Sequence, residues 1–241
     1  MNSPLIERSL LVFGEEGIAK LASSHVLVAG VGGVGGFVSE SLARAGIGKL
    51  TLVDHDEVSP SNLNRQIIAL NSTLGLNKAE VMKGRILDIN PNCQVVVLKK
   101  FLKPEDMEEL LSIPFDFVVD AIDSLNCKVS LIEVAFNKGL PVVSSMGAGR
   151  RIDPTKIEVC DFSKTHTCGL ARQVRQRLRK RGISKGVQVV FSSELPLPAG
   201  SMEEIEGARG RVVNGTASYM PGIFGLMLSG LVISKLVAVG I

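Results

Sequence analysis

The chain has 241 residues, of which 45% are hydrophobic and 21% charged, and its net charge is +3. This length buries a substantial core, so a single domain over residues 1–241 needs no disulfide framework. The four cysteines form no C-x-x-C pair, which argues against a structural zinc site. The first residues show no basic segment followed by an apolar run, so no signal peptide is predicted and a cytoplasmic protein is expected.

Through residue 145 the sequence alternates short apolar runs with helical patterns. Helices are predicted at residues 3–22, 34–45, 77–89, 104–111 and 124–138, and strands at 25–30, 48–54, 94–98, 115–120 and 141–145. Nearly continuous apolar strands are typical of a parallel sheet buried on both faces. The predicted fold is therefore α/β: a Rossmann-like, doubly wound, mainly parallel sheet with helices on both faces. Right-handed crossovers would put a ligand at the carboxyl ends of the strands.

After Gly147 the pattern weakens, and an elaborated C-terminal part is predicted. Strands are expected at 156–160 and 187–191, with a basic helix between them and a loop at 196–207. In the last segment, 219–241, Lys235 is the single charged residue, and the segment is nearly long enough to span a membrane. Pro221 and four glycines favour a helix packed inside the fold or a dimer. Peripheral membrane association is the alternative.

Between Asp161 and Glu194 there is no acidic residue, although the stretch contains eight lysines and arginines. Many charge runs are solvated helix faces, but a run without a single acid favours binding to nucleic-acid phosphates. We therefore interpret residues 161–210 as a basic substrate-binding insertion within the domain. Its candidate nucleic-acid contacts are Lys164, Arg172, Arg175, Arg179 and Lys180. If the stretch is helical, the three arginines share one face.

A glycine-rich turn follows the first predicted strand, with glycines at positions 30, 32, 33 and 35. Gly30, Gly32, Gly33 and Gly35 would let the backbone approach a phosphate at a helix N-terminus. Asp54 ends the second strand, where a carboxylate can accept hydrogen bonds from ribose hydroxyls. The motif alone suits NAD or FAD as well as ATP, and a tight turn without ligand remains an alternative.

Two cations near this turn favour ATP. Arg65 lies in the loop sequence SNLNRQ, and Lys78 opens the helix at 77–89, where Asn77 and Glu80 have capping-box spacing. A lysine in a first helical turn opposes the helix dipole, which is better explained if Lys78 faces a phosphate than if it is a solvated surface residue. Two cations suit a triphosphate attacked at its α-phosphorus, whereas hydride transfer has no need for them.

Asp123 follows the fourth predicted strand within the sequence DAIDS. It stands where a helix begins, so one interpretation is an N-cap. Its position at the carboxyl end of a strand also suits a Mg²⁺ ligand, because this ion prefers hard oxygen donors. The two roles are compatible.

The joint set GVGGVG, LVDHD, SNLNRQ, the lysine of LNKAE, and DAIDS resembles the ubiquitin-activating-enzyme superfamily over about residues 5–160. This superfamily includes the ThiF- and MoeB-type adenylating enzymes of thiamine and molybdopterin synthesis. The resemblance implies a site for ATP and Mg²⁺ in which Asp54 holds the ribose and Asp123 the metal. It implies further that triphosphate contacts come from Asn62, Arg65 and Lys78, with Asp56 and Gln66 in the same site. Arg8 resembles an arginine that the family supplies across a homodimer.

The later sequences KTHTCGLARQVRQRLRKRGI and VQVVFSSELP are similar to the tRNA threonylcarbamoyladenosine dehydratase branch of that superfamily. The resemblance implies adenylation of the threonyl carboxylate of a modified tRNA adenosine, followed by ring closure. The main alternative activates the C-terminus of a ubiquitin-like sulfur carrier, with a sulfur-transfer or cysteine-desulfurase partner. An NAD-dependent oxidoreductase and a non-catalytic scaffold are less favoured.

Cys168 departs from this branch, in which an acidic residue is expected near that place. Some members of the superfamily use a cysteine as a thioester acceptor. We interpret Cys168 as a buried cysteine without that role, and His166 as a surface or RNA-contacting residue.

Overall fold

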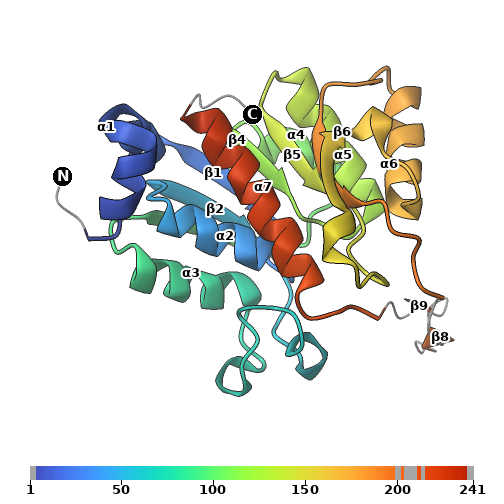
Figure 1. Ribbon diagram of the computed structural model, residues 1–241, viewed down its shortest axis with the longest axis horizontal. Helices are drawn as coiled ribbons and strands as arrows, with labels where there is room; N and C mark the ends of the chain where they lie inside the picture. Colours follow the sequence, from blue (N-terminus) through green and yellow to red (C-terminus); the bar gives the residue numbers. More distant parts are fainter. Residues whose placement is uncertain (1–3, 199–201, 204–210, 213–214, 238–241) are drawn as a thin grey trace.

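The central sheet has seven strands in the order β3-β2-β1-β4-β5-β7-β6 (Figure 1). A computed structural model of the protein describes residues 4–198, 202–203, 211–212 and 215–237. The strands are β1 His25–Ala29, β2 Lys49–Val53, β3 Gln94–Leu98, β4 Phe117–Asp120, β5 Val142–Ser145, β6 Ile157–Asp161 and β7 Gln188–Ser192. All pairings are parallel except that of β6, which closes the edge as an antiparallel partner of β7. The predicted doubly wound, mainly parallel sheet is confirmed.

Helices cover both faces of this sheet (Figure 1). The helices of one face are α1 Glu7–Ser23, α2 Gly35–Arg44, α3 Lys78–Ile89 and α7 Met220–Leu236, and those of the other are α4 Met107–Leu110, α5 Leu125–Asn137 and α6 Gly169–Lys180. Side chains of β1 alternate between two cores: Val26 and Val28 pack under the first set, and Leu27 under the second. Burial on both faces explains why the strands are apolar throughout.

Most predicted elements differ from the observed ones only at their ends. The helix predicted at 104–111 is instead a 3₁₀ turn, Pro104–Asp106, followed by the single turn of α4. The helix predicted from residue 3 begins at Glu7, and its start at Ser3 lies outside the described residues. Gly14 interrupts α1 with a φ of 67°, a conformation that glycine adopts without a steric penalty.

The predicted loop at 196–207 lies partly outside the described residues. Within it, β8 Met202–Glu203 pairs with β9 Arg211–Val212 as a two-stranded antiparallel ribbon, which the sequence pattern did not indicate. Each of these strands has only two residues, which is too short for an alternating pattern to be recognised in the sequence.

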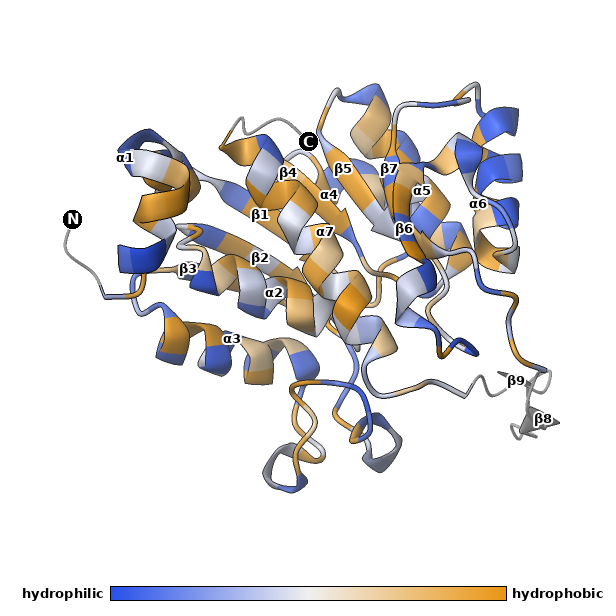
Figure 2. Ribbon diagram, viewed as in Figure 1, coloured by the Kyte–Doolittle hydropathy of each residue, from blue (hydrophilic) through white to orange (hydrophobic). Residues whose placement is uncertain are grey.

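The apolar C-terminal segment forms α7, which crosses α2 and covers β5 and β7 (Figures 1 and 2). Phe224, Leu228 and Val232 are fully buried in the core beneath it. Gly225 permits close packing, because a Cβ there would lie 2.5 Å from the carbonyl oxygen of Val34. The prediction of a helix packed inside the fold is confirmed. In the part of the chain that the structure describes, no helix is long and apolar enough to cross a membrane.

Candidate active site

The site lies where the order of strands reverses, between β1 and β4. Chain connections leave these neighbouring strands in opposite directions, which opens a crevice at their carboxyl ends. Gly30 follows β1 with a φ of 90°, and a Cβ at this residue would lie 2.7 Å from the carbonyl oxygen of Ala121. A Cβ on Gly35 would lie 1.8 Å from the oxygen of Gly30. The turn therefore requires glycine at both positions on steric grounds.

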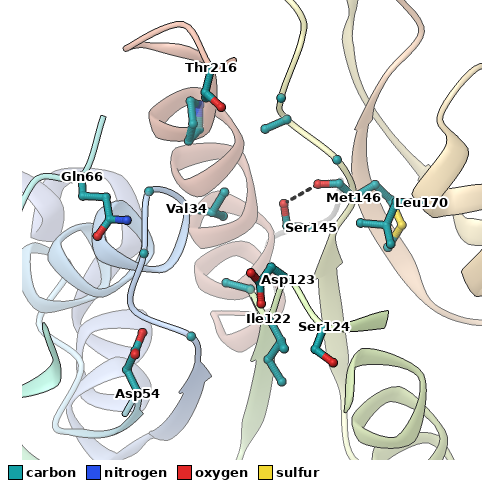
Figure 3. Close-up of a pocket in the computed structure, with 18 of the residues that line it drawn as sticks. Val34, Asp54, Gln66, Ile122, Asp123, Ser124, Ser145, Met146, Leu170 and Thr216 are labelled. Atoms are coloured by element: carbon teal, nitrogen blue, oxygen red, sulfur yellow. Dashed lines mark hydrogen bonds between the residues drawn. The ribbon is translucent and has the colours of Figure 1, made fainter. Parts of the chain in front are cut away.

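A cavity of about 600 Å³ occupies this crevice. Its wall includes Gly30, Gly32, Gly33, Asp54, Asp56, Arg65, Gln66, Lys78 and Asp123, which are nine of the predicted site residues. Figure 3 shows Asp54 and Gln66 on one side of the cavity, Met146 and Leu170 on the other, and Asp123 between them. The structure thus brings together residues that are far apart in the sequence.

Asp54 holds the glycine-rich turn in place. One carboxylate oxygen accepts a hydrogen bond from the N–H of Val31 at 2.7 Å, and the other accepts one from the N–H of Asp56 at 2.9 Å. The side chains of Asp54, His55 and Asp56 place one ligand atom each within 4.8 Å of one another. Lys78 pairs with Asp56, so the negative charge of this three-residue cluster is partly neutralised by the lysine.

Lys78 is the first residue of α3, and only 6% of it is exposed. Its Nζ donates to Asp56 at 2.8 Å. Asn77 caps the helix by accepting a hydrogen bond from the N–H of Glu80 at 3.2 Å. The unfavourable position of this lysine at a helix N-terminus is offset by a carboxylate, and its ammonium group remains at the cavity wall.

The predicted site residues of the loop before α3 differ in whether they reach the cavity. Arg65 lines the cavity and donates to the carbonyl oxygen of Ser61 at 2.8 Å. Gln66 is buried, and its Oε1 has no hydrogen-bond partner among the described residues. Asn62 is not part of the cavity wall; its side-chain oxygen accepts from the N–H of Ser59 at 3.1 Å and so shapes the loop.

Two other predicted residues also lie off this wall. Gly35 lies behind the turn, where its lack of a Cβ lets α2 approach β1. Arg8 is exposed on α1, outside the cavity of its own chain. Asp123 faces the cavity, but the N-cap of α5 is Ser124, so the interpretation of Asp123 as the cap is wrong by one residue.

Sequence reasoning missed a buried ion pair beneath the site. The Nζ of Lys128 lies 2.7 Å from the carboxylate of Asp120 and donates to the carbonyl oxygen of Ser145 at 2.9 Å. Asp120 also accepts from the hydroxyl of Ser144 at 2.5 Å and from the N–H of Ile122 at 3.1 Å. These bonds fix the carboxyl ends of β4 and β5 next to the segment that leads from β4 to Asp123. The available signal was a lysine between the apolar residues Cys127 and Val129.

The far side of the cavity is formed by residues 146–151 and by the start of α6. Cys168 is the N-cap of α6, is 4% exposed, and accepts from the N–H of Ala171 at 3.5 Å. Its interpretation as a buried cysteine is confirmed. His166 is exposed and packs edge-on against Phe191, with ring centroids 5.2 Å apart.

The basic residues of α6 are not equivalent. Arg172, Arg179 and Lys180 are exposed, as is Lys164 before the helix. The guanidinium of Arg175 instead donates to the backbone oxygen of Thr165 at 2.6 Å and is part-buried. The structure therefore separates the predicted arginine face into exposed residues and one that supports the preceding turn. In Figure 2 the outer side of α6 is hydrophilic.

Comparisons with known proteins show the family of the chain. The model of the ThiF family matches residues 6–240. A tRNA threonylcarbamoyladenosine dehydratase from Bacillus subtilis is 42% identical over 237 residues, which cover 95% of this chain and 93% of that protein. The solved structure of the Escherichia coli tRNA N6-threonylcarbamoyladenosine dehydratase in complex with ATP matches with a TM-score of 0.86 and 37% identity, covering 96% of this chain and 93% of that one.

Similarity to an enzyme of the sulfur-carrier type is more limited. A molybdopterin-synthase adenylyltransferase from Haemophilus influenzae is 34% identical over 152 residues, which cover 63% of this chain and 60% of that protein. The similarity to the dehydratases extends through the basic segment, whereas this one is confined to a shorter stretch. The chain belongs to the ThiF family, and within it to the tRNA threonylcarbamoyladenosine dehydratases.

Proposed function

We propose that this protein uses ATP to adenylate the threonyl carboxylate of threonylcarbamoyladenosine in tRNA and then cyclises it with net loss of water. The observation that carries the proposal is a single cavity that extends from the glycine-rich turn to the first turn of the basic helix α6. A nucleotide and a polyanionic acceptor would meet in it at Asp123. The basic segment 161–210 is then the part that binds the acceptor.

The nucleotide end of the cavity fits ATP by its shape and donors. Gly33 leaves room that a side chain would fill, since a Cβ there would lie 3.0 Å from Pro221. Asp54 would accept from the ribose, while Arg65 and Lys78 would neutralise charge that develops on the phosphates. The unpartnered oxygen of Gln66 would accept a hydrogen bond from the bound ligand.

The reaction then has two steps. The threonyl carboxylate attacks the α-phosphorus of ATP and pyrophosphate leaves, which gives an acyl adenylate. The carbamoyl oxygen of the same nucleoside attacks the acyl carbon, AMP leaves with one oxygen of the original carboxylate, and the carbamoyl nitrogen loses its proton to solvent. Both reacting groups belong to one substrate, so ring closure gains from proximity and requires no enzyme nucleophile.

Mg²⁺ would bind at Asp123 and supply further charge neutralisation at the triphosphate. Arg8 would act on the ATP of a second subunit in a homodimer. The exposed apolar residues Leu11 and Val12, which are 78% and 73% exposed, lie close to it in the sequence and would be covered by that partner.

The test is mass analysis of nucleosides from modified tRNA incubated with the enzyme and ATP. We expect conversion of threonylcarbamoyladenosine to a product lighter by one water, with formation of AMP and pyrophosphate. Matched reactions use unmodified tRNA and the Lys78→Ala enzyme. Unchanged tRNA from an enzyme that exchanges pyrophosphate with a Gly-Gly-ended protein would establish the sulfur-carrier alternative instead.

Cys168 lines the cavity but is only 4% exposed, and its Sγ accepts the N–H of Ala171 as the cap of α6, which supports a reaction without a thioester. The Cys168→Ala enzyme should retain cyclisation and lose only the weak cap on α6. Loss of all product with intact ATP binding would show instead that the thiol is essential.

A further inference from the structure

The wall of the cavity opposite the glycine-rich turn contains a buried arginine. Only 4% of Arg151 is exposed, and the residue lines the cavity. Its Nη1 donates to the carbonyl oxygen of Gly149 at 3.0 Å, while its Nε has no partner in the described part of the chain. A fully satisfied structural arginine would not leave a buried donor unpaired.

The charge of Arg151 is equally uncompensated. Among the described residues it forms no ion pair, in contrast to the buried Lys128, which pairs with Asp120. An unpaired buried cation is unfavourable, because it loses hydration without gaining a counter-charge. The edge of the guanidinium that carries Nε and Nη2 has the spacing of a carboxylate, with two parallel N–H donors.

The N-terminus of α6 adds donors at the same place. Gly169 and Leu170 are its first two residues and both line the cavity. Their N–H groups have no acceptor within the helix, and the dipole of this 12-residue helix favours an anion there. Arg151 and this helix end are close together: a Cβ on Gly147 would lie 3.9 Å from Nη1 of Arg151 and 3.5 Å from Sγ of Cys168.

Both segments are held in unusual backbone conformations. Arg150 and Thr167, which precede Arg151 and Cys168, have φ values of 59° and 52°. Glu194 accepts from the N–H groups of Ile152 and Asp153 at 3.0 Å and so fixes the chain after Arg151. Strain of this kind persists where the surrounding structure enforces it, often at binding sites.

We propose that Arg151 and the first turn of α6 form the binding site for the acceptor carboxylate. The site rests on the proposed function in one respect, namely that the carboxylate belongs to the threonylcarbamoyl group. This site lies on the opposite side of Asp123 from the phosphate-binding residues. A carboxylate bound there would be positioned to attack the α-phosphorus. Arg151 is then a substrate-binding residue that sets selectivity for an anionic acceptor.

The first experiment measures steady-state kinetics with modified tRNA and with ATP. Arg151→Gln should raise KM for tRNA about 10- to 100-fold, as expected for a lost hydrogen-bonded charge, while the Kd for ATP stays within about twofold of wild type. Arg44→Gln removes a guanidinium that pairs with Glu40 on α2 and should change neither value. Equal effects of Arg151→Gln on both substrates would overturn the inference.

A second pair of variants tests the helix end without touching Arg151. Gly169→Pro removes one N–H at the first helical position, where proline fits, and the extended backbone of Cys168, with φ −91° and ψ 117°, tolerates a following proline. Gly169→Ala keeps the N–H, and a Cβ there meets no atom within 4 Å among the described residues. KM for tRNA should rise several-fold more in the proline variant than in the alanine variant. Identical KM values in the two variants would overturn the role of the helix end.

The decisive measurement separates the anion site from the identity of the acceptor. Calorimetry with a non-hydrolysable ATP analogue would compare threonylcarbamoyladenosine with its uncharged carboxamide, and a Gly-Gly peptide with its amide. Wild type should prefer the carboxylate in the first pair, and Arg151→Gln should lose that preference. An Arg151-dependent preference seen with the peptide alone would support the anion site and refute the proposed function. A preference that survives Arg151→Gln, or no preference in either pair, would overturn the inference.

Discussion

The two ends of the cavity are built in different ways. The nucleotide end stands on β1, β2 and β4, which are almost wholly buried, and its glycines are required by contacts with neighbouring backbone. The acceptor end consists of loops and the start of α6, held by long-range bonds: Glu194 binds residues 152 and 153, and the N–H of Arg150 donates to the oxygen of Gly215 at 2.8 Å. The nucleotide end is fixed by steric constraints together with the hydrogen bonds of Asp54, whereas the acceptor end is fixed by long-range hydrogen bonds alone.

This difference indicates a division of tasks. Phosphate binding by backbone N–H groups changes little when surface side chains are substituted. The nucleotide end is therefore suited to the ATP-dependent step that a whole family shares. An acceptor end made of side-chain charges can change its substrate without disturbing the sheet. Variants should therefore separate into those that impair ATP chemistry with any acceptor and those that impair only the acceptor.

The largest expected effect is at Lys128, beneath the strand ends shared by both regions. Lys128→Met leaves the carboxylate of Asp120 buried without its cation and should lower the free energy of unfolding by about 3–5 kcal/mol. Urea unfolding measures this. The double variant Asp120→Leu/Lys128→Met should recover part of the loss. A single variant as stable as wild type would mean that the pair does not support the two regions.

Lys78 tests the nucleotide end alone. Lys78→Ala should slow ATP–pyrophosphate exchange by about 10²- to 10³-fold, because a preorganised cation at the reacting phosphate is lost. Lys83→Ala on the same helix is the matched control and should exchange normally. The division of tasks fails if Lys78→Ala weakens only the binding of tRNA.

Two arginines of α6 test the acceptor end. Arg172→Gln should weaken tRNA binding and reduce the slope of log Kd against log salt concentration by about 1, as expected for one lost phosphate contact. Arg175→Gln should instead leave that slope unchanged and lower Tm, since Arg175 binds the backbone of Thr165. Filter binding at several salt concentrations and thermal unfolding distinguish the two. Equal slopes for Arg172→Gln and wild type would remove α6 from the tRNA surface.

The smallest effect concerns pH and belongs to neither end of the cavity, because His25 begins β1 at the edge of the sheet opposite the cavity. Burial, and then the charge of Lys49, lower the pKa of His25 from its ordinary value of 6.5, against the opposing influence of Pro114 and Asp116. As pH falls below about 6.5, the unfolded chain gains this proton before the folded one does. The free energy of unfolding therefore decreases between about pH 6.5 and the lowered pKa, and it is unaffected by His25 above about pH 6.5. Urea unfolding at pH 7.5 and pH 5 should therefore show a smaller acid loss for His25→Gln than for wild type. An equal loss would place the acid sensitivity elsewhere.

Much of the nucleotide end was predictable because its signals are local. Apolar runs of strand length, glycines at Gly30 and Gly35, and Lys78 after a capping Asn77 each follow from a few adjacent residues. Asn62 shows the limit of that reasoning: its residue type suits a phosphate contact, but its side chain is used by the loop itself. Whether a polar residue faces a ligand or its own backbone depends on the direction of the chain, which residue type does not determine.

The sequence by itself determined the sheet, the glycine-rich turn, the cations beside it and the basic character of α6, since periodicity, steric limits and charge are carried by neighbouring residues. Only the tertiary structure decided that Lys128 pairs with Asp120, that Arg175 supports a turn, and that Arg151 is buried without a counter-charge beside the start of α6. The physical reason is that burial and pairing are properties of segments brought together by folding. Neither is encoded in the local sequence around a charged residue.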